Sequence, residues 1–101
     1  MRYRVIFRAE ARAEALEAAK YIREVSGPST ALKWYEGLES VVNALEEMPH
    51  RHAFARENGL VAGVELRQVV YGSHRLIFMV QDDVVHVLHV RHASRRDLDE
   101  I

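Results

Sequence analysis

The spacing of hydrophobic residues changes along the chain and divides it into a short strand, a helical region and a strand-rich region. Residues 3–8 alternate Tyr, Val and Phe with Arg, Ile and Arg, which is typical of a strand. From Glu10 the composition changes to Ala, Glu, Arg and Lys, which are strong helix formers. The apolar stripe predicted for this first helix contains Leu16, Ala19, Ile22 and Val25, with Ala15 and Ala18 beside them.

A second helix is predicted to follow directly. Gly27 can adopt the left-handed cap and Pro28 cannot continue a helix, so the first helix is expected to end there. Ser29 or Thr30 is the expected N-cap of the second helix, which Pro49 stops. The gap of about four residues predicts an antiparallel hairpin. The apolar face of the second helix contains Ala31, Trp34, Tyr35, Leu38, Val42, Leu45 and Met48.

The rest of the chain predicts a loop and three strands. Residues 49–63 have no sustained period and contain two glycines, so we expect a long surface loop of the kind that is often functional. Strands are predicted at 64–71, 74–80 and 84–92, joined by tight hairpin turns. The order β-α-α-β-β-β predicts an α+β fold, with the helical hairpin on one face of a small, mainly antiparallel sheet and the other face open. Residues 1–101 are expected to form a single domain.

Composition narrows the class of protein. A hydrophobic content of 49% excludes disorder, and no apolar run approaches the roughly 20 residues of a membrane-spanning helix. The N-terminal segment is too charged for a signal peptide. The lack of cysteine excludes disulfides and thiolate metal sites and permits a reducing cytoplasm, which is the expected location. A net charge of −1 is evidence against a general nucleic-acid binder, which is usually strongly basic.

The last predicted strand carries three histidines, His86, His89 and His92, which raises the question of a metal site. Side chains alternate between the faces of a strand, so His86 and His92 are expected on one face and His89 on the other. His50 and His52 could add ligands only from a loop, and without cysteine or an HExxH motif this is a weak indication. We therefore expect no metal and no cofactor, and we interpret His86 and His89 as half-exposed strand residues.

His92 has different surroundings because it ends the strand between Arg91 and Arg95. Arg67 and Arg75, in the two preceding strands, could come close to it in an antiparallel sheet. A histidine among arginines can act as a general acid or base near neutral pH, while guanidinium groups hold phosphate oxygens bidentately. The pattern suits either RNA cleavage or the capture of an acidic partner. The alternative is a solvated strand end that pairs with glutamates.

Three stretches of sequence carry a resemblance to a known family. YRVIF and the Ala/Glu-rich helix after it resemble the family's opening strand and first helix, and ALKWYEGLESVVNALEEMP resembles its second helix. LRQVVYGSHRLIFMVQDDVVHVLHVRHASRRD resembles its meander, with an arginine on each side of a turn and a histidine at the last strand end. The family is the RelE/ParE superfamily of type II toxin–antitoxin toxins, which includes plasmid stabilisation proteins. The resemblance covers nearly the whole chain and implies a growth-inhibiting toxin neutralised by an antitoxin encoded nearby.

The superfamily divides by target. In RelE-like members, which cut ribosome-bound mRNA, basic residues on the second and third strands hold the RNA, and the last strand ends in a basic residue followed by arginine and later by tyrosine. Arg67 and Arg75 match the first feature, and His92 would be the catalytic residue. However, Ala93 follows His92, no later tyrosine occurs, and Asp97 puts negative charge where phosphate would lie. Ribonuclease activity is therefore the alternative, and the residue set favours a protein that is not an enzyme.

The phrase VLHVRHASRRD is similar to that of ParE-like members, which are associated with inhibition of DNA gyrase. That similarity implies a toxin that stabilises a damaging gyrase–DNA state without covalent chemistry of its own. In this interpretation the C-terminal arginines bind the target, and the arginines of the two preceding strands are partly structural. The residues expected to bind the target are Arg67, Arg75, Arg91, His92 and Arg95.

Trp34 and Tyr35 lie on or beside the apolar stripe of the second predicted helix and are expected to be core residues. The alternative is that they contact the antitoxin, because the antitoxin segment in this family lies against the toxin's helices and sheet edge, and an amphipathic partner can bury apolar residues in such a groove. A third interpretation of the whole chain is a toxin fold that has lost toxicity and serves only as an antitoxin-binding regulatory module.

Overall fold

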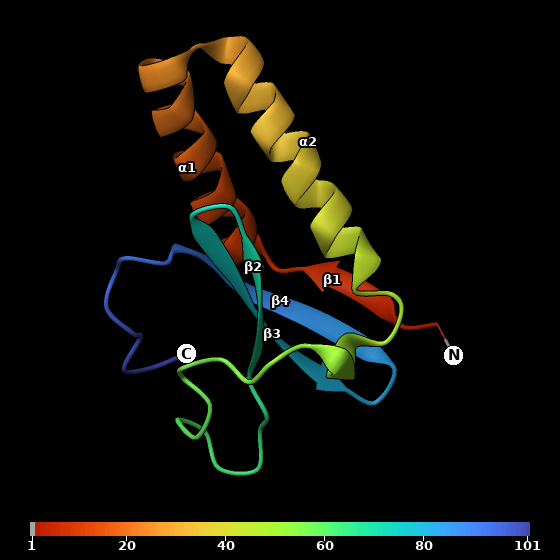
Figure 1. The fold of residues 1–101 in the computed structure, drawn as a ribbon. Helices are drawn as coiled ribbons and strands as arrows, with labels where there is room; N and C mark the ends of the chain where they lie inside the picture. Colours follow the sequence, from red (N-terminus) through yellow and green to blue (C-terminus); the bar gives the residue numbers. More distant parts are fainter. Residues whose placement is uncertain (1) are drawn as a thin grey trace.

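The computed structural model describes residues 2–101 and confirms the predicted β-α-α-β-β-β order. In this part of the chain the strands form a four-stranded sheet in the order β1-β4-β3-β2 (Figure 1). β1 runs parallel to β4, and the other neighbours are antiparallel. The α+β fold with a mainly antiparallel sheet is therefore confirmed. The elements are β1 (Arg4–Phe7), α1 (Ala9–Ser26), α2 (Pro28–Ala44), a 3-10 turn η1 (Pro49–Arg51), β2 (Arg67–Tyr71), β3 (His74–Gln81) and β4 (Val84–His92).

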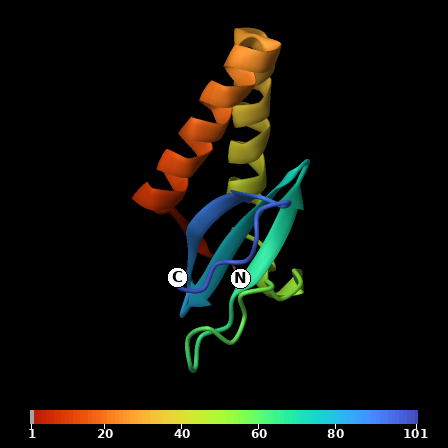
Figure 2. The ribbon, with the colours of Figure 1, turned by 90° about the vertical axis from the view of Figure 1, so that its left-hand side faces the viewer.

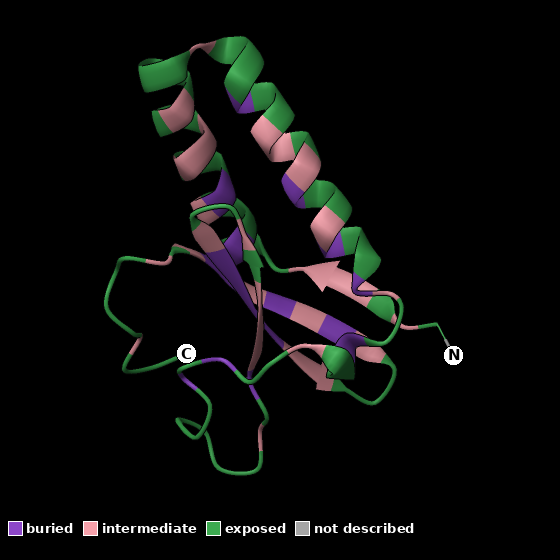
Figure 3. Ribbon diagram, in the orientation of Figure 1, coloured by how far each residue is buried: buried purple, intermediate pink, exposed green. Residues whose placement is uncertain are grey.

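The main core lies between the helices and one face of the sheet. Buried residues follow β3 and β4 and the ends of the helices nearest the sheet, whereas the tip of the helical hairpin is exposed (Figure 3). The hairpin leans on the sheet at one end, and its tip stands clear of the strands in both views (Figure 1 and Figure 2). No helix within residues 2–101 is long and apolar enough to cross a membrane. The buried members of this core are Ala11, Ala15, Leu38, Val42, Leu45, Leu76, Phe78, Val85, Val87 and Val90.

The apolar stripe predicted for the first helix is right for Ala15, and for Ala18, Ala19 and Ile22, which are half-buried, but it is wrong for Leu16 and Val25. Ala11 and Ala15 are fully buried, while Leu16 is 54% and Val25 65% exposed. Small side chains at the buried positions allow α1 to lie close to β4, which a leucine would prevent. The two most buried positions of α1 are therefore alanines, of which the predicted stripe contained Ala15 but not Ala11.

The turn between the helices is tighter than predicted. Gly27 alone separates α1 from α2, with a φ of 94°, and its N–H is bonded to the Arg23 carbonyl at 2.9 Å. Pro28 starts α2 as its first residue, where the missing N–H costs no hydrogen bond. The predicted N-cap at Ser29 or Thr30 is wrong, because both residues already lie inside the helix.

α2 comes unusually close to the edge strand β2. A Cβ atom at Gly37 would overlap the hydroxyl of Tyr71. That hydroxyl donates a hydrogen bond to the Trp34 carbonyl at 2.8 Å. Gly37 therefore permits a contact between α2 and β2 that any larger residue would push apart.

The face of the sheet predicted to be open is covered in the structure. The long loop after η1 and the C-terminal segment lie across it and form a second buried cluster of Ala55, Leu66 and Ile77, with Leu98 packed against it. The loop also pairs with β2, since the Gln68 N–H is bonded to the Ala53 carbonyl at 3.0 Å. The strand predicted at 64–71 begins only at Arg67, because the residues before it turn to meet the loop.

A β-bulge in β4 corrects the predicted faces of the histidines: His86 pairs with Met79 and His92 with His74, which point to opposite faces of β3, so His86 and His92 do not share a face. Phe78 lies opposite Val87 and Ile77 opposite His89, so Leu88 is an extra residue that breaks the alternation. His89 is buried, with 5% of its surface exposed, which corrects the prediction of a half-exposed residue. His86 is half-buried, as predicted. Within residues 2–101 no group of three or more His, Asp or Glu side chains is placed to hold a metal ion.

Replacing Leu38 with alanine is expected to lower the free energy of unfolding by about 2–5 kcal/mol. Leu38 is fully buried in the main core, so its truncation leaves a cavity beneath α2. Denaturant unfolding measures the change, and Leu32→Ala is the matched control because Leu32 lies on the same helix with 60% of its surface exposed. The control should change stability by less than about 0.5 kcal/mol. An equally small effect of Leu38→Ala would contradict the assigned core.

Candidate functional site

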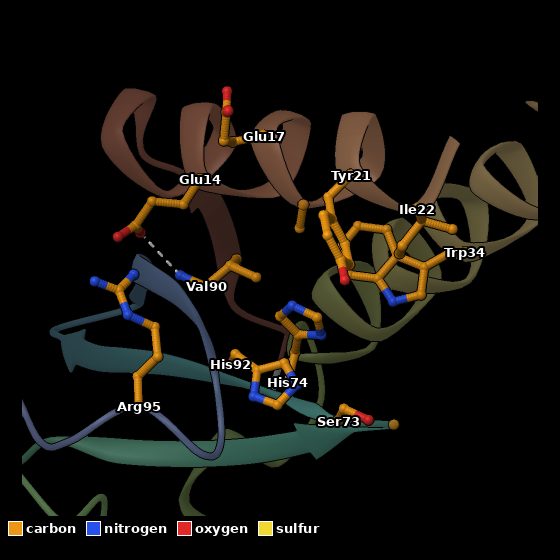
Figure 4. Close-up of a pocket in the computed structure, with 12 residues that line it drawn as sticks. Glu14, Glu17, Tyr21, Ile22, Trp34, Ser73, His74, Val90, His92 and Arg95 are labelled. Carbon is orange, nitrogen blue, oxygen red and sulfur yellow. Dashed lines mark hydrogen bonds between the residues drawn. The ribbon is translucent and has the colours of Figure 1, made fainter. Parts of the chain in front are cut away.

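A cavity of about 660 Å³ lies between the helical hairpin and one end of the sheet (Figure 4). It forms where α1 and α2 leave the sheet toward the exposed tip of the hairpin. Apolar walls with a few polar groups at the mouth are typical of binding sites, and the volume lies within the usual range for such sites. The cavity is lined by Glu14, Glu17, Ala18, Tyr21, Ile22, Trp34, Gly72, Ser73, His74, Val90, His92 and Arg95.

A row of rings crosses the cavity from α2 to β4. His74 begins β3 and lies opposite His92, with their ring centroids 5.1 Å apart. The indole of Trp34 packs edge-on against His74, also at 5.1 Å. Burial lowers the pKa of His74 from its ordinary value of 6.5, and the nearby His92 lowers it further. Trp34 and His92, predicted to serve different partners, therefore lie in one cavity and are linked by His74.

Protonation of His74 should be visible in the fluorescence of Trp34, the chain's single tryptophan. A charged imidazole against the indole quenches its emission, so we expect the emission to fall as the pH falls. Because the pKa of His74 is lowered, the midpoint should lie below 6.5. His74→Gln should remove the transition. A transition that keeps its midpoint in that variant would assign the signal to another group.

Contacts with Ser94 constrain the ring of His92. The Ser94 N–H donates to Nδ1 of His92 at 3.1 Å, and the Ser94 hydroxyl lies 2.7 Å from the same atom. An Nδ1 that accepts a backbone hydrogen bond carries no proton, so the neutral ring carries its proton on Nε2. His92 is therefore held in one tautomer by the turn that follows β4.

Charged side chains of both signs line the cavity. Glu14 and Glu17 come from α1, and Arg95 extends from the turn after β4 toward Glu14 (Figure 4). Glu14 accepts hydrogen bonds from the Val90 N–H at 3.0 Å and from Nδ1 of His89 at 3.1 Å. The bond to Glu14 raises the pKa of His89 above its ordinary value. Glu14 therefore ties α1 to β4, while no salt bridge within residues 2–101 involves Arg95.

Arg75 does not lie in this cavity, which corrects the expectation of a single surface patch. It faces the covered side of the sheet with 1% of its surface exposed. Its two terminal nitrogens bind the two carboxylate oxygens of Glu57, with Nη1–Oε1 at 2.7 Å, and Nη1 also donates to Gln68 at 3.0 Å. The hydrogen bond from Arg75 lowers the pKa of Glu57 to about 2. Both terminal nitrogens of Arg75 are therefore engaged within the protein, while its Nε is buried without a hydrogen-bond partner in residues 2–101.

The other predicted arginines also have internal partners. Arg67 donates to the His52 carbonyl at 2.7 Å and lies over the ring of Phe54. It stands at the far end of β2, four residues or about 13 Å from the end that adjoins His74. Arg91 donates from Nη2 to the Arg96 carbonyl at 2.7 Å. Neither of the two arginines lines the cavity.

The structure therefore brings together Trp34, His92 and Arg95 among the predicted site residues. Tyr35 lies outside the cavity, packed against the main core, with its hydroxyl accepting a bond from Arg12 at 3.3 Å. Sequence reasoning missed His74 and Glu57. An arginine inside the apolar strand HRLIFMV is the signal for Glu57, because a buried guanidinium requires a carboxylate partner.

Comparison with solved structures shows that the fold is shared with chains from bacterial and archaeal toxin–antitoxin systems. The chain superposes on one from the chromosomal ParDE toxin–antitoxin system of P. aeruginosa with a TM-score of 0.74 and 18% identity, covering 91% of this chain and 97% of that one. A chain of the archaeal RelE–RelB complex from Pyrococcus horikoshii OT3 superposes with a TM-score of 0.59 and 19% identity, covering 95% of this chain and 100% of that one. A chain of the toxin–antitoxin complex RelBE2 from Mycobacterium tuberculosis superposes with a TM-score of 0.55 and 23% identity, covering 91% of this chain and 99% of that one.

Sequence comparison identifies the family. No curated protein matches the chain. Residues 5–97 match the model of the ParE toxin of the type II toxin–antitoxin system parDE, and this match spans every strand and helix of the core apart from the first residue of β1. The chain therefore belongs to the ParE toxin family of type II toxin–antitoxin systems.

Proposed function

We propose that this ParE-family toxin inhibits growth by poisoning DNA gyrase and does not cut RNA. The buried ion pair between Arg75 and Glu57 is the main observation that favours gyrase poisoning over RNA cleavage. In a RelE-like nuclease an arginine at this position would hold phosphate, but here an internal carboxylate already occupies both of its terminal nitrogens. An RNA phosphate would have to displace Glu57 from a site that is closed to solvent.

The surroundings of His92 also support a binding role. A nuclease would need groups that bind the RNA phosphate around a histidine free to exchange protons. Ala93 follows His92 where RelE-like members carry arginine, so a guanidinium group that would bind the phosphate is absent at that position. Arg95 supplies exposed positive charge at the cavity mouth, which suits recognition of an acidic surface. The target-binding surface is thus reduced from the predicted set to His92 and Arg95, with Arg91 holding the segment behind them.

A ParD-like antitoxin encoded nearby is the proposed second partner. The related structure from P. aeruginosa belongs to a ParDE system. The cavity offers apolar surface from Tyr21, Ile22 and Trp34 to an amphipathic segment. A carboxylate on that segment would find Arg95 at the mouth. Tyr35, which lies outside the cavity, is not part of this contact surface.

Induction in a bacterial host tests the proposed target. A gyrase poison should trigger the DNA damage response while messenger RNA stays intact, and co-expression of the neighbouring open reading frame should suppress the response. Rapid messenger RNA decay without DNA damage would overturn the proposal in favour of the ribosome-dependent nuclease. Neither response, together with stable binding of the antitoxin, would indicate a non-toxic regulatory module.

A further inference from the structure

A side chain from the long loop closes the turn that displays Arg95. Arg56 donates from Nη2 to the Ala93 carbonyl at 3.2 Å, and its Nε pairs with the Asp97 carboxylate at 2.7 Å. These two acceptors lie at the two ends of residues 93–97. One guanidinium group therefore spans the base of the turn, with Arg95 at its middle.

The remaining contacts hold the turn at its ends. On the strand side the Ala93 N–H is bonded to the Ser73 carbonyl at 2.8 Å. Beyond the turn the Leu98 N–H is bonded to the Glu57 carboxylate at 3.0 Å. Arg91 also crosses the turn, since its Nε and Nη2 donate to the Arg96 carbonyl at 3.1 and 2.7 Å, and Arg75 lies 3.8 Å from Asp97. Arg56 is the group that joins the two ends of the turn from the long loop. Its ion pair is about half exposed to solvent, so its removal does not open the buried core.

We propose that Arg56 is a positioning residue for target recognition, which holds the 93–97 turn closed so that Arg95 faces the cavity mouth. The inference rests on the proposed role of Arg95 in binding the target. An open turn would have to order several backbone residues when the target binds, and each ordered residue costs free energy. If the turn is already closed before the target binds, this ordering cost does not reduce the affinity, which is the general advantage of a preorganised surface. The guanidinium fork suits this task because it can satisfy a carbonyl and a carboxylate at once.

Amide hydrogen exchange tests whether Arg56 holds the 93–97 turn closed (the Arg56 clamp), and this test requires no target. The Arg95 N–H is bonded to the His92 carbonyl at 3.1 Å, so its protection reports whether the turn is closed. In Arg56→Gln we expect this amide to exchange about tenfold faster or more, as expected when local opening becomes easier. The amides of β4 and the melting temperature should not change. Arg51→Gln is the matched control, since it removes the same charge from the same connection between α2 and β2. Unchanged exchange at Arg95 in Arg56→Gln would overturn the inference.

Growth inhibition at matched expression tests the consequence. We expect Arg56→Gln to weaken inhibition about tenfold, which corresponds to ordering roughly one backbone residue on binding. Arg56→Lys should restore part of the loss, because lysine keeps the charge near Asp97 but cannot reach both ends of the turn, and Arg51→Gln should have no effect. Full inhibition by Arg56→Gln, while Arg95→Ala is inactive, would overturn the positioning role. Full inhibition by Arg95→Ala itself would instead count against the proposed target-binding surface, and the exchange result would still decide the clamp.

Discussion

Glu57→Ala is expected to lower the free energy of unfolding by about 3–5 kcal/mol, the usual cost of leaving one member of a buried ion pair without its partner. Arg75 and Glu57 expose 1% and 0% of their side chains, so no water can replace the missing carboxylate without structural change. Arg75 would also lose the group that accepts from two of its nitrogens. The Leu98 N–H would lose its acceptor as well, which loosens the C-terminal segment.

Denaturant unfolding measures this loss, and Glu65→Ala is the matched control. Glu65 belongs to the same loop and also pairs with an arginine, but its side chain is 63% exposed and lies 3.4 Å from Arg67. An exposed pair of this kind contributes about 0–1 kcal/mol. Equal effects of Glu57→Ala and Glu65→Ala would show that the Arg75 pair is not buried in solution.

The ion pair between Arg75 and Glu57 also makes the free energy of unfolding depend on pH. The pKa of Glu57 is about 2 in the folded state and near its ordinary value of 4.5 when unfolded. The stabilisation is therefore fully present above about pH 4.5 and is lost as the pH falls toward 2, a difference of roughly 3 kcal/mol. Glu57→Gln should flatten this part of the acid unfolding curve, because glutamine does not titrate.

Local patterns in the sequence predict the order of elements, because each element shows its own period. The alternation of residues 3–8 and the long apolar strands near the C-terminus require no knowledge of distant contacts. The rotation of α1 is different. Ala11 and Ala15 are buried because β4 approaches them closely, and a pattern of hydrophobicity alone ranks Leu16 above them. A close contact between distant elements decided which side of the helix faces inward.

The candidate site was harder to predict because it depends on one irregularity of the sheet. Counted from Gln81 opposite Val84, a regular hairpin places Arg91 opposite His74. The bulge at Leu88 moves the pairing by one residue, so that His92 lies opposite His74. This shift forms the ring pair in the cavity and turns Arg91 to the other face. No local feature of the sequence VVHVLHV marks the bulge.

The covering of the second face was missed for a related reason. Residues 49–63 show no period, so the sequence predicts a surface loop, yet Ala55 and Glu57 are buried. Their burial depends on Arg75 and Ile77 of β3, which the loop meets only in the folded chain. The covering also buries the guanidinium group of Arg75 against Glu57.

Arg95→Ala is expected to abolish growth inhibition, whereas His92→Gln should weaken it only mildly. Arg95 lines the cavity and takes part in no salt bridge in the described part of the chain, so its charge is available to a target. His92 contributes ring surface next to His74, and glutamine retains a polar side chain of similar reach. Arg91→Ala should also reduce inhibition, because Arg91 holds the Arg96 carbonyl and with it the segment that follows Arg95.

Growth of the induced host at matched expression measures these three effects, with Arg51→Gln as the control for loss of a positive charge elsewhere. A nuclease gives the opposite order for His92. General acid–base catalysis contributes about 10²–10⁴-fold, so His92→Gln would then be severe. Full inhibition in all three variants would make the turn after β4 a solvated strand end and would place target recognition on another surface. The order of the Arg95 and His92 effects therefore separates binding from catalysis in a single assay, because only catalysis requires the imidazole to transfer a proton.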